Sequence, residues 1–135
     1  MAVWQADFTI LIARSWPSDF AVRLDAVAPR SRPLLPGTAP WGSDDGNRLD
    51  VYIDEGQPTE GQLRLDLRNW DERFVEPVLE LLRDWGSTLA GPGGRAVEPV
   101  LGEVALAARG SPAFRFVEDP EMFFRRLELG GLEDA

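Results

Sequence analysis

Two segments with strict alternation constrain the fold of this chain most strongly. They are RLDVYID, residues 48–54, and QLRLDLR, residues 62–68. In both, an aliphatic side chain occupies every second position and Asp, Arg or Tyr occupies the positions between. A period of two is typical of a strand with one buried and one solvated face. The stretch between them, EGQPTEG, contains two glycines and Pro58, so the pair predicts an antiparallel hairpin with residues 55–61 as its turn.

Charge predicts the register of this hairpin. In one register Asp50 faces Asp66, and like charges directly opposite each other destabilise a strand pair. In the register shifted by two residues, Asp50 faces Arg68 and Asp54 faces Arg64. Opposite charges favour the second register, and both registers keep the leucine face inward.

Further strands and helices are predicted on both sides of the hairpin. Residues 3–13 are apolar nearly throughout their second half, which is typical of a central strand. Helical spacing of apolar residues predicts helices at 69–86, 98–109 and 119–129. Residues 87–90 suit a short strand and 91–94 a turn, and residues 111–117 fit either a short helix or an extended piece.

Capping residues mark the predicted helix ends. Asn69 with Glu72 resembles a capping box, and Gly86 supplies a stop. Pro77 requires this helix either to begin near Arg73 or to kink, because proline removes a backbone donor and clashes with the preceding turn. In the next helix Pro99 suits the first helical position, with Val100, Leu101, Val104 and Ala108 facing inward.

Residues 18–28 and 29–42 are less regular. Phe20, Leu24 and Val27 follow helical spacing after Ser18 as an N-cap, although the same stretch also alternates like a strand. Helix is the favoured interpretation. Residues 29–42 contain four prolines and two glycines, which predicts a loop whose apolar residues lie on the body of the domain.

These elements predict a single domain, residues 1–135, of the α+β class. An antiparallel sheet of about four strands would have helices packed on one face. Its other face would be polar, with the side chains of Asp50, Tyr52, Asp54, Arg64, Asp66 and Arg68.

Missing residue types limit the chemistry. The chain has no His, Cys or Lys, and all 14 of its basic residues are Arg. His-based acid–base catalysis, Ser–His and Cys–His nucleophile pairs, Schiff bases and the usual zinc, haem and iron–sulfur ligands are therefore excluded. We expect no enzyme activity and no cofactor. The lack of cysteine, of a secretory leader and of a long apolar run predicts a cytoplasmic protein.

The net charge of −9 is concentrated in the middle of the chain. Residues 41–91 carry five Arg against twelve acidic residues. The negative electrostatic field of these residues disfavours binding to nucleic acid and to anionic membranes, which require a basic surface. It favours a basic protein partner.

The stretch WGSDDGNRLDVYIDEG, residues 41–56, combines five carboxylates with two aromatic residues. The spacing does not fit an EF-hand, because aligning either glycine puts Trp41 or Val51 at the first ligand position. Asp44 and Asp45 are instead expected to shape a turn. The predicted partner-binding residues are Trp41, Asp44, Asp45, Asp50, Tyr52, Asp54 and Asp66.

Two other functions stay open. One is a divalent-metal protein or carboxylate-dependent enzyme that uses Asp44, Asp45, Asp50 or Asp54. The other is a homo-oligomeric structural protein that buries Trp41 and the proline-rich loop between subunits.

Three stretches resemble segments of small acidic bacterial proteins of uncharacterised function. They are WGSDDGNRLDVYIDEG, LDLRNW and FVEDPEMFFRRL, and the shared pattern is W-G-x-x-D-G-N-R-h-D-V followed by F-V-x-D-P-x-x-F. The resemblance covers about residues 41–127 and assigns no catalytic residue. In size, acidity and single-domain build the chain is also similar to immunity proteins that neutralise secreted toxins. The resemblance implies a bacterial protein-interaction module that binds a basic partner as an immunity protein or antitoxin does.

Overall fold

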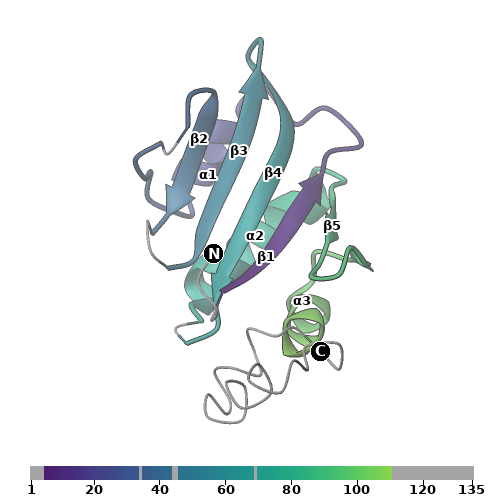
Figure 1. Cartoon of the computed structure of the whole chain (residues 1–135). Coiled ribbons are helices and arrows are strands. Elements are labelled where there is room, and N and C mark those ends of the chain that lie inside the picture. The colour runs from purple at the N-terminus through teal and green to yellow at the C-terminus, as the bar shows by residue number, and fades with distance from the viewer. Residues whose placement is uncertain (1–4, 34, 44–45, 69, 111–135) are drawn as a thin grey trace.

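The structure is a computed structural model that describes residues 5–33, 35–43, 46–68 and 70–110. Within these residues it contains six strands and three helices (Figure 1). In chain order they are β1 (Gln5–Leu11), α1 (Phe20–Asp25), β2 (Thr38–Gly42), β3 (Arg48–Asp54), β4 (Gln57–Asp66), α2 (Glu72–Asp84), β5 (Thr88–Ala90), β6 (Ala96–Val97) and α3 (Leu101–Arg109).

The strands form one antiparallel sheet in the order β2-β3-β4-β1-β5-β6. This confirms the α+β class, the central place of β1 and the short strand at β5. The sheet has six strands where about four were predicted. The additional strands are β2, hidden in the proline-rich segment, and β6, which is only two residues long.

Strand β2 is tolerated despite Pro40 because it lies at the edge of the sheet, where proline's missing N–H costs least. The preceding segment runs along its outer side. Arg30 forms an isolated antiparallel bridge with Trp41, the amide of Ser31 donates to Pro40 at 3.1 Å, and the amide of Gly42 donates to Pro29 at 2.8 Å. Part of the predicted loop is therefore a strand, and residues 29–31 cover its edge.

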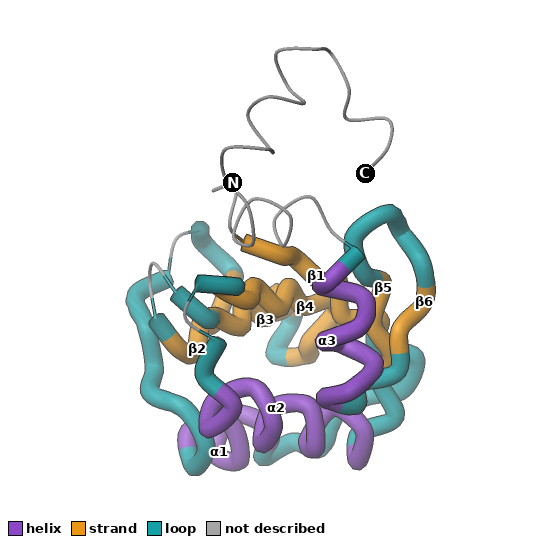
Figure 2. The backbone as a smooth tube through the Cα atoms, turned by 90° about the horizontal axis from the view of Figure 1, so that it is seen from below, coloured by secondary structure: helices purple, strands orange, loops and turns teal. Residues whose placement is uncertain are grey.

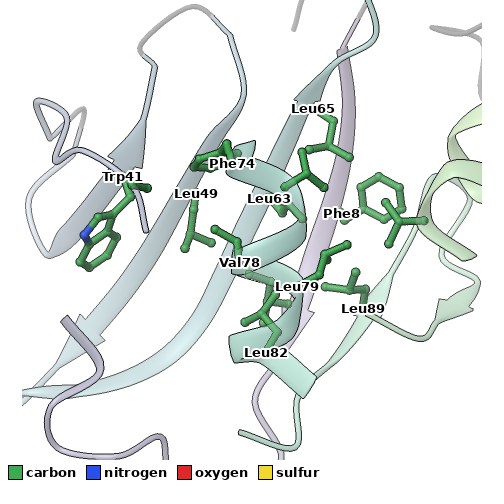
Figure 3. Close-up of a cluster of buried hydrophobic side chains, with 14 of the residues drawn as sticks. Phe8, Trp41, Leu49, Leu63, Leu65, Phe74, Val78, Leu79, Leu82 and Leu89 are labelled. Carbon is green, nitrogen blue, oxygen red and sulfur yellow. The ribbon is translucent and has the colours of Figure 1, made fainter. Parts of the chain in front are cut away.

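Helices α1 and α2 lie along one face of the sheet, and α3 lies beside the end that carries β5 and β6 (Figure 2). The core fills the space between the sheet and α2 (Figure 3). Alternate residues of the strands point into it, and α2 contributes a stripe at helical spacing. The central buried side chains are Phe8, Leu49, Leu63, Leu65 and Leu89 from the sheet and Phe74, Val78, Leu79 and Leu82 from α2.

The predicted register of the β3–β4 hairpin is wrong. Arg48 lies opposite Arg64, and Asp50 lies opposite Gln62. The turn contains only Glu55 and Gly56, with φ values of 52° and 78°. Positive φ at both central residues is the geometry of a tight type I′ hairpin, so β4 begins at Gln57, five residues earlier than predicted.

Local ion pairs explain why the two arginines tolerate facing each other. Arg48 pairs with Asp50 on its own strand at 3.0 Å, and Arg64 pairs with Asp7 of β1 at 3.3 Å. The charges within the hairpin alone do not predict this register, because Arg64 pairs with a residue of β1, the other neighbour of β4.

Residues 20–25 form a helix, as favoured, but Ser18 is not its cap. The N-cap is Asp19, whose side chain makes no capping hydrogen bond. Helix α2 begins at Glu72, later than the predicted range of 69–86 but in agreement with the alternative that it begins near Arg73. Its N-cap is Asp71, which accepts from the amide of Arg73 at 3.1 Å, so the expected Asn69–Glu72 box is not what begins it. The helix continues through Pro77 without interruption.

Helix α3 begins at Leu101 with Val100 as its N-cap, so Pro99 precedes it and does not occupy its first position. Val104 and Ala108 are buried as predicted, but Val100 is exposed. The predicted segments 111–117 and 119–129 lie outside the described residues, as do Asp44, Asp45 and Asn69. Among the helices that the structure describes, none has the length and apolar character needed to cross a membrane.

Candidate functional site

The polar face of the sheet, opposite α1 and α2, contains a hollow of about 310 Å³. Its floor comes from β1, β3 and β4, and its wall from β2 and the segment before it. Of the predicted partner-binding residues, it brings together Asp50 and Tyr52. The lining residues are Asp7, Leu35, Thr38, Asp50, Tyr52, Gln62 and Arg64.

Ion pairs neutralise the charges at this hollow. Asp50 accepts from the Nε of Arg48 with both carboxylate oxygens, at 3.1 and 3.0 Å. The Arg48 side chain is fully buried and also donates to the carbonyl of Arg32 at 3.0 Å. Asp7 pairs with Arg64, with about a third of each side chain exposed. The acidic strand face expected from the sequence is therefore close to neutral here.

Trp41 is fully buried, so its ring is not exposed on the surface of this structure. Its indole N–H donates to Asp25 at 2.8 Å, and the Arg30 guanidinium lies 4.6 Å from the centre of its ring. Arg30 also pairs with Asp25 at 2.7 Å. The hydrogen bonds from Arg30 and Trp41 hold the pKa of Asp25 below its ordinary value. This group ties α1 to the proline-rich segment and so has a structural role.

Asp66 is also inside the protein, with 6% of its side chain exposed. Its carboxylate accepts from the amide of Arg68 at 2.9 Å, and its own amide donates to the Asn47 side chain at 3.0 Å. It lines a second hollow of about 580 Å³ at the end of the sheet, next to Gly42 and Phe74. Asn47 and Gly42 belong to the stretch that carries the sequence resemblance, and here they shape a corner of the fold.

Asp54 lies at the exposed tip of the β3–β4 hairpin, opposite Gln57, far along the strand from Asp50. In residues 5–33, 35–43, 46–68 and 70–110, no three acidic side chains are grouped where they could hold a metal ion.

A row of acidic side chains on α2 was missed in the sequence. Glu72, Glu76, Glu80 and Asp84 are all exposed, and they follow one another at intervals of four residues. We call them the acidic row. Four-residue spacing places them along one side of the helix over about 18 Å. The sequence DERFVEPVLELLRDW contains this four-residue spacing of carboxylates in addition to the apolar stripe that predicts the helix.

The acidic row is not neutralised within the part of the chain that the structure describes. The ion pairs there join Asp19–Arg23, Asp25–Arg30, Asp50–Arg48, Asp7–Arg64, Asp66–Arg68 and Asp71–Arg73. None of these pairs includes a member of the row. Arg83, on the same helix, donates to the carbonyl of Pro99 at 2.7 Å. The row therefore presents its charge to solvent.

Comparison of the chain with protein-family models, with curated proteins and with solved structures finds no match in any of the three.

Proposed function

We propose that this protein is a non-enzymatic interaction module that binds a basic protein through the acidic row of α2. In its concrete form it acts in the bacterial cytoplasm as an immunity or antitoxin-like protein does, by docking on a cationic surface of its partner. The observation that carries the proposal is that Glu72, Glu76, Glu80 and Asp84 are exposed and form no ion pair with any residue that the structure describes. The charged groups on the polar face of the sheet, in contrast, are paired with each other.

The energetics of the row support this function. Like charges four residues apart destabilise a helix by about 0.2–0.5 kcal/mol per pair, and the row contains three such pairs in sequence. No arginine among residues 5–33, 35–43, 46–68 and 70–110 forms an ion pair with the row to relieve this repulsion. A partner that presents Lys or Arg along the helix would relieve the repulsion within the row. The negative electrostatic field of the row would also speed the encounter with such a partner.

The absence of lysine gives a direct test. A carbodiimide joins carboxylates to amines without a spacer, and this chain has no lysine amine, so its only amine is the N-terminus. Cross-links from internal carboxylates to lysine amines must therefore reach a partner. The protein is treated in a lysate of its source bacterium, and the linked carboxylates are located by peptide mass spectrometry.

We expect links at Glu76 and Glu80 to lysines of a basic protein, with a yield that falls as salt is raised. The double variant Glu76→Gln/Glu80→Gln should lower the yield of that partner strongly. The matched control is Glu98→Gln/Glu103→Gln, which removes two other exposed carboxylates that form no ion pair with a described residue. Equal yields from both variants would remove the acidic row from the proposal.

A further inference from the structure

The hollow on the polar face of the sheet has the dimensions of a site for a small ligand. Its volume of about 310 Å³ lies at the lower end of the range for small-molecule pockets, which is about 300–1,000 Å³. Three neighbouring strands form the floor, so the floor side chains are held on rigid elements. Leu35, from the segment before β2, forms part of the wall.

The charges of the hollow cancel in pairs. Asp50 is matched by Arg48, and Asp7 is matched by Arg64. An ionic ligand would therefore gain no net Coulomb attraction there and would disturb two existing pairs. These pairs favour a ligand without net charge.

The floor nevertheless retains many hydrogen-bonding groups. Arg64 bonds to Asp7 through Nε, which leaves the N–H groups of its two terminal nitrogens. Gln62 donates one N–H to Thr9 at 3.2 Å and keeps its carbonyl oxygen and a second N–H. Asp7 lies opposite Arg64 on β1 and Asp50 lies opposite Gln62 on β3, the two strands that run on either side of β4 at a backbone spacing of about 5 Å. Donors and acceptors thus alternate at the spacing of adjacent strands.

Tyr52 on the floor and Leu35 on the wall supply apolar contact. Tyr52 is partly exposed, and its hydroxyl makes no hydrogen bond to any other described residue. Leu35 is 56% exposed. A ring with hydroxyl groups on its rim and C–H groups on its face would match both the hydrogen-bonding groups and the apolar surfaces of the hollow. Each hydroxyl donates to a carboxylate and accepts from an amide or guanidinium, while the C–H face packs on Tyr52 and Leu35.

From this geometry we infer that the hollow formed by Asp7, Leu35, Asp50, Tyr52, Gln62 and Arg64 is a binding site for a small neutral polyhydroxylated ring, of the size of a monosaccharide. The site is separate from the acidic row, which lies on α2 on the other side of the sheet (Figure 2). It therefore stands independently of the proposed protein partner.

Tyr52 provides the probe, because it is the only tyrosine in the chain. Protein with isotope-labelled tyrosine gives one set of ring signals, which needs no assignment. D-glucose, D-galactose and D-mannose are titrated separately while these signals are followed by nuclear magnetic resonance. We expect at least one sugar to shift them along a saturable curve at millimolar concentration, with the same affinity at low and high sodium chloride.

Three variants complete the test. Gln62→Leu removes hydrogen-bonding groups from the floor and should weaken binding by about fivefold or more, as expected for one lost hydrogen bond. Leu35→Ser removes apolar wall from an exposed position that the fold does not depend on, and it should also weaken binding. Gln57→Leu, an exposed change on the same strand outside the hollow, should leave binding unchanged.

The inference is overturned if none of the three sugars moves the Tyr52 signals. It is also overturned if Gln62→Leu and Gln57→Leu bind alike. A response to lysine or glutamate that exceeds the response to every sugar would contradict the requirement for a neutral ligand.

Discussion

Replacing Gly42 with alanine should destabilise this protein far more than a glycine substitution usually does. Gly42 has a φ of 103°, a backbone conformation that residues with a Cβ atom rarely adopt. A Cβ built there would lie 2.4 Å from the carbonyl oxygen of Asn47 and 3.0 Å from a ring carbon of Phe74. The Asn47 carbonyl cannot withdraw easily, because it accepts from the amide of Ser43 at 2.9 Å and closes the loop between β2 and β3.

The magnitude follows from two costs. An unfavourable backbone conformation costs about 1–3 kcal/mol, and an overpacked contact that displaces its neighbours costs about 1–3 kcal/mol more. Together they give a loss of about 4 kcal/mol for Gly42→Ala. Gly56→Ala is the matched control, since Gly56 has a φ of 78° but nothing within 4 Å of its Cβ position. That variant should lose only about 1–2 kcal/mol.

Urea unfolding followed by tryptophan fluorescence measures both variants against the parent protein. The expected result is a difference of about 2–3 kcal/mol between them, obtained with equal slopes of free energy against urea. If Gly42→Ala costs no more than Gly56→Ala, then the close approach of Gly42, Asn47 and Phe74 does not hold in solution.

Two further outcomes are expected. Glu76→Gln/Glu80→Gln removes every neighbouring like-charge pair of the acidic row, so it should stabilise the protein by about 1 kcal/mol in urea unfolding at low salt, and a loss of stability would contradict the repulsion invoked for α2. Asp25→Asn should cost stability at neutral pH but progressively less in acid. Because the folded pKa of Asp25 is held below its ordinary value of 3.8, its stabilising contribution is complete above that pH and disappears as the pH falls through the folded pKa. Thermal unfolding of both proteins, measured from neutral pH down through the folded pKa of Asp25, tests this prediction. A stability cost of Asp25→Asn that does not change with pH would contradict it.

Periodicity in the sequence predicted most of the elements that build the core. Strand β1, the two strands of the hairpin and helix α2 each repeat apolar residues at one clear period, because one side of each is buried. Boundaries were less predictable. The β3–β4 register depended on a two-residue turn at Glu55 and Gly56 and on the Arg64–Asp7 pair with β1, neither of which appears in the charge pattern of the hairpin alone.

The structure brings some of the predicted partner-binding residues together on one surface and places others in the interior. Asp50 and Tyr52 do lie together on the polar face of the sheet. Trp41 and Asp66 are buried with their polar groups hydrogen-bonded. The indole N–H of Trp41 donates to Asp25, which is distant in sequence, and the carboxylate of Asp66 accepts from the nearby amide of Arg68. The contact between Trp41 and Asp25 depends on tertiary packing, which alternation in the sequence does not encode. The acidic row was within reach of the sequence, since four-residue spacing is a helical pattern for charges as well as for apolar residues.

The covering of β2 by residues 29–31 determines how this sheet meets other chains. An open edge strand offers its unpaired amides and carbonyls as a template for another strand, which leads to strand exchange or fibre growth. Here the amide of Ser31 and the carbonyl of Pro29 already bond to β2, and Pro40 has no amide to offer. At the opposite edge, β6 is too short to template a long strand. Neither edge of the described sheet therefore favours its extension by a strand from another chain.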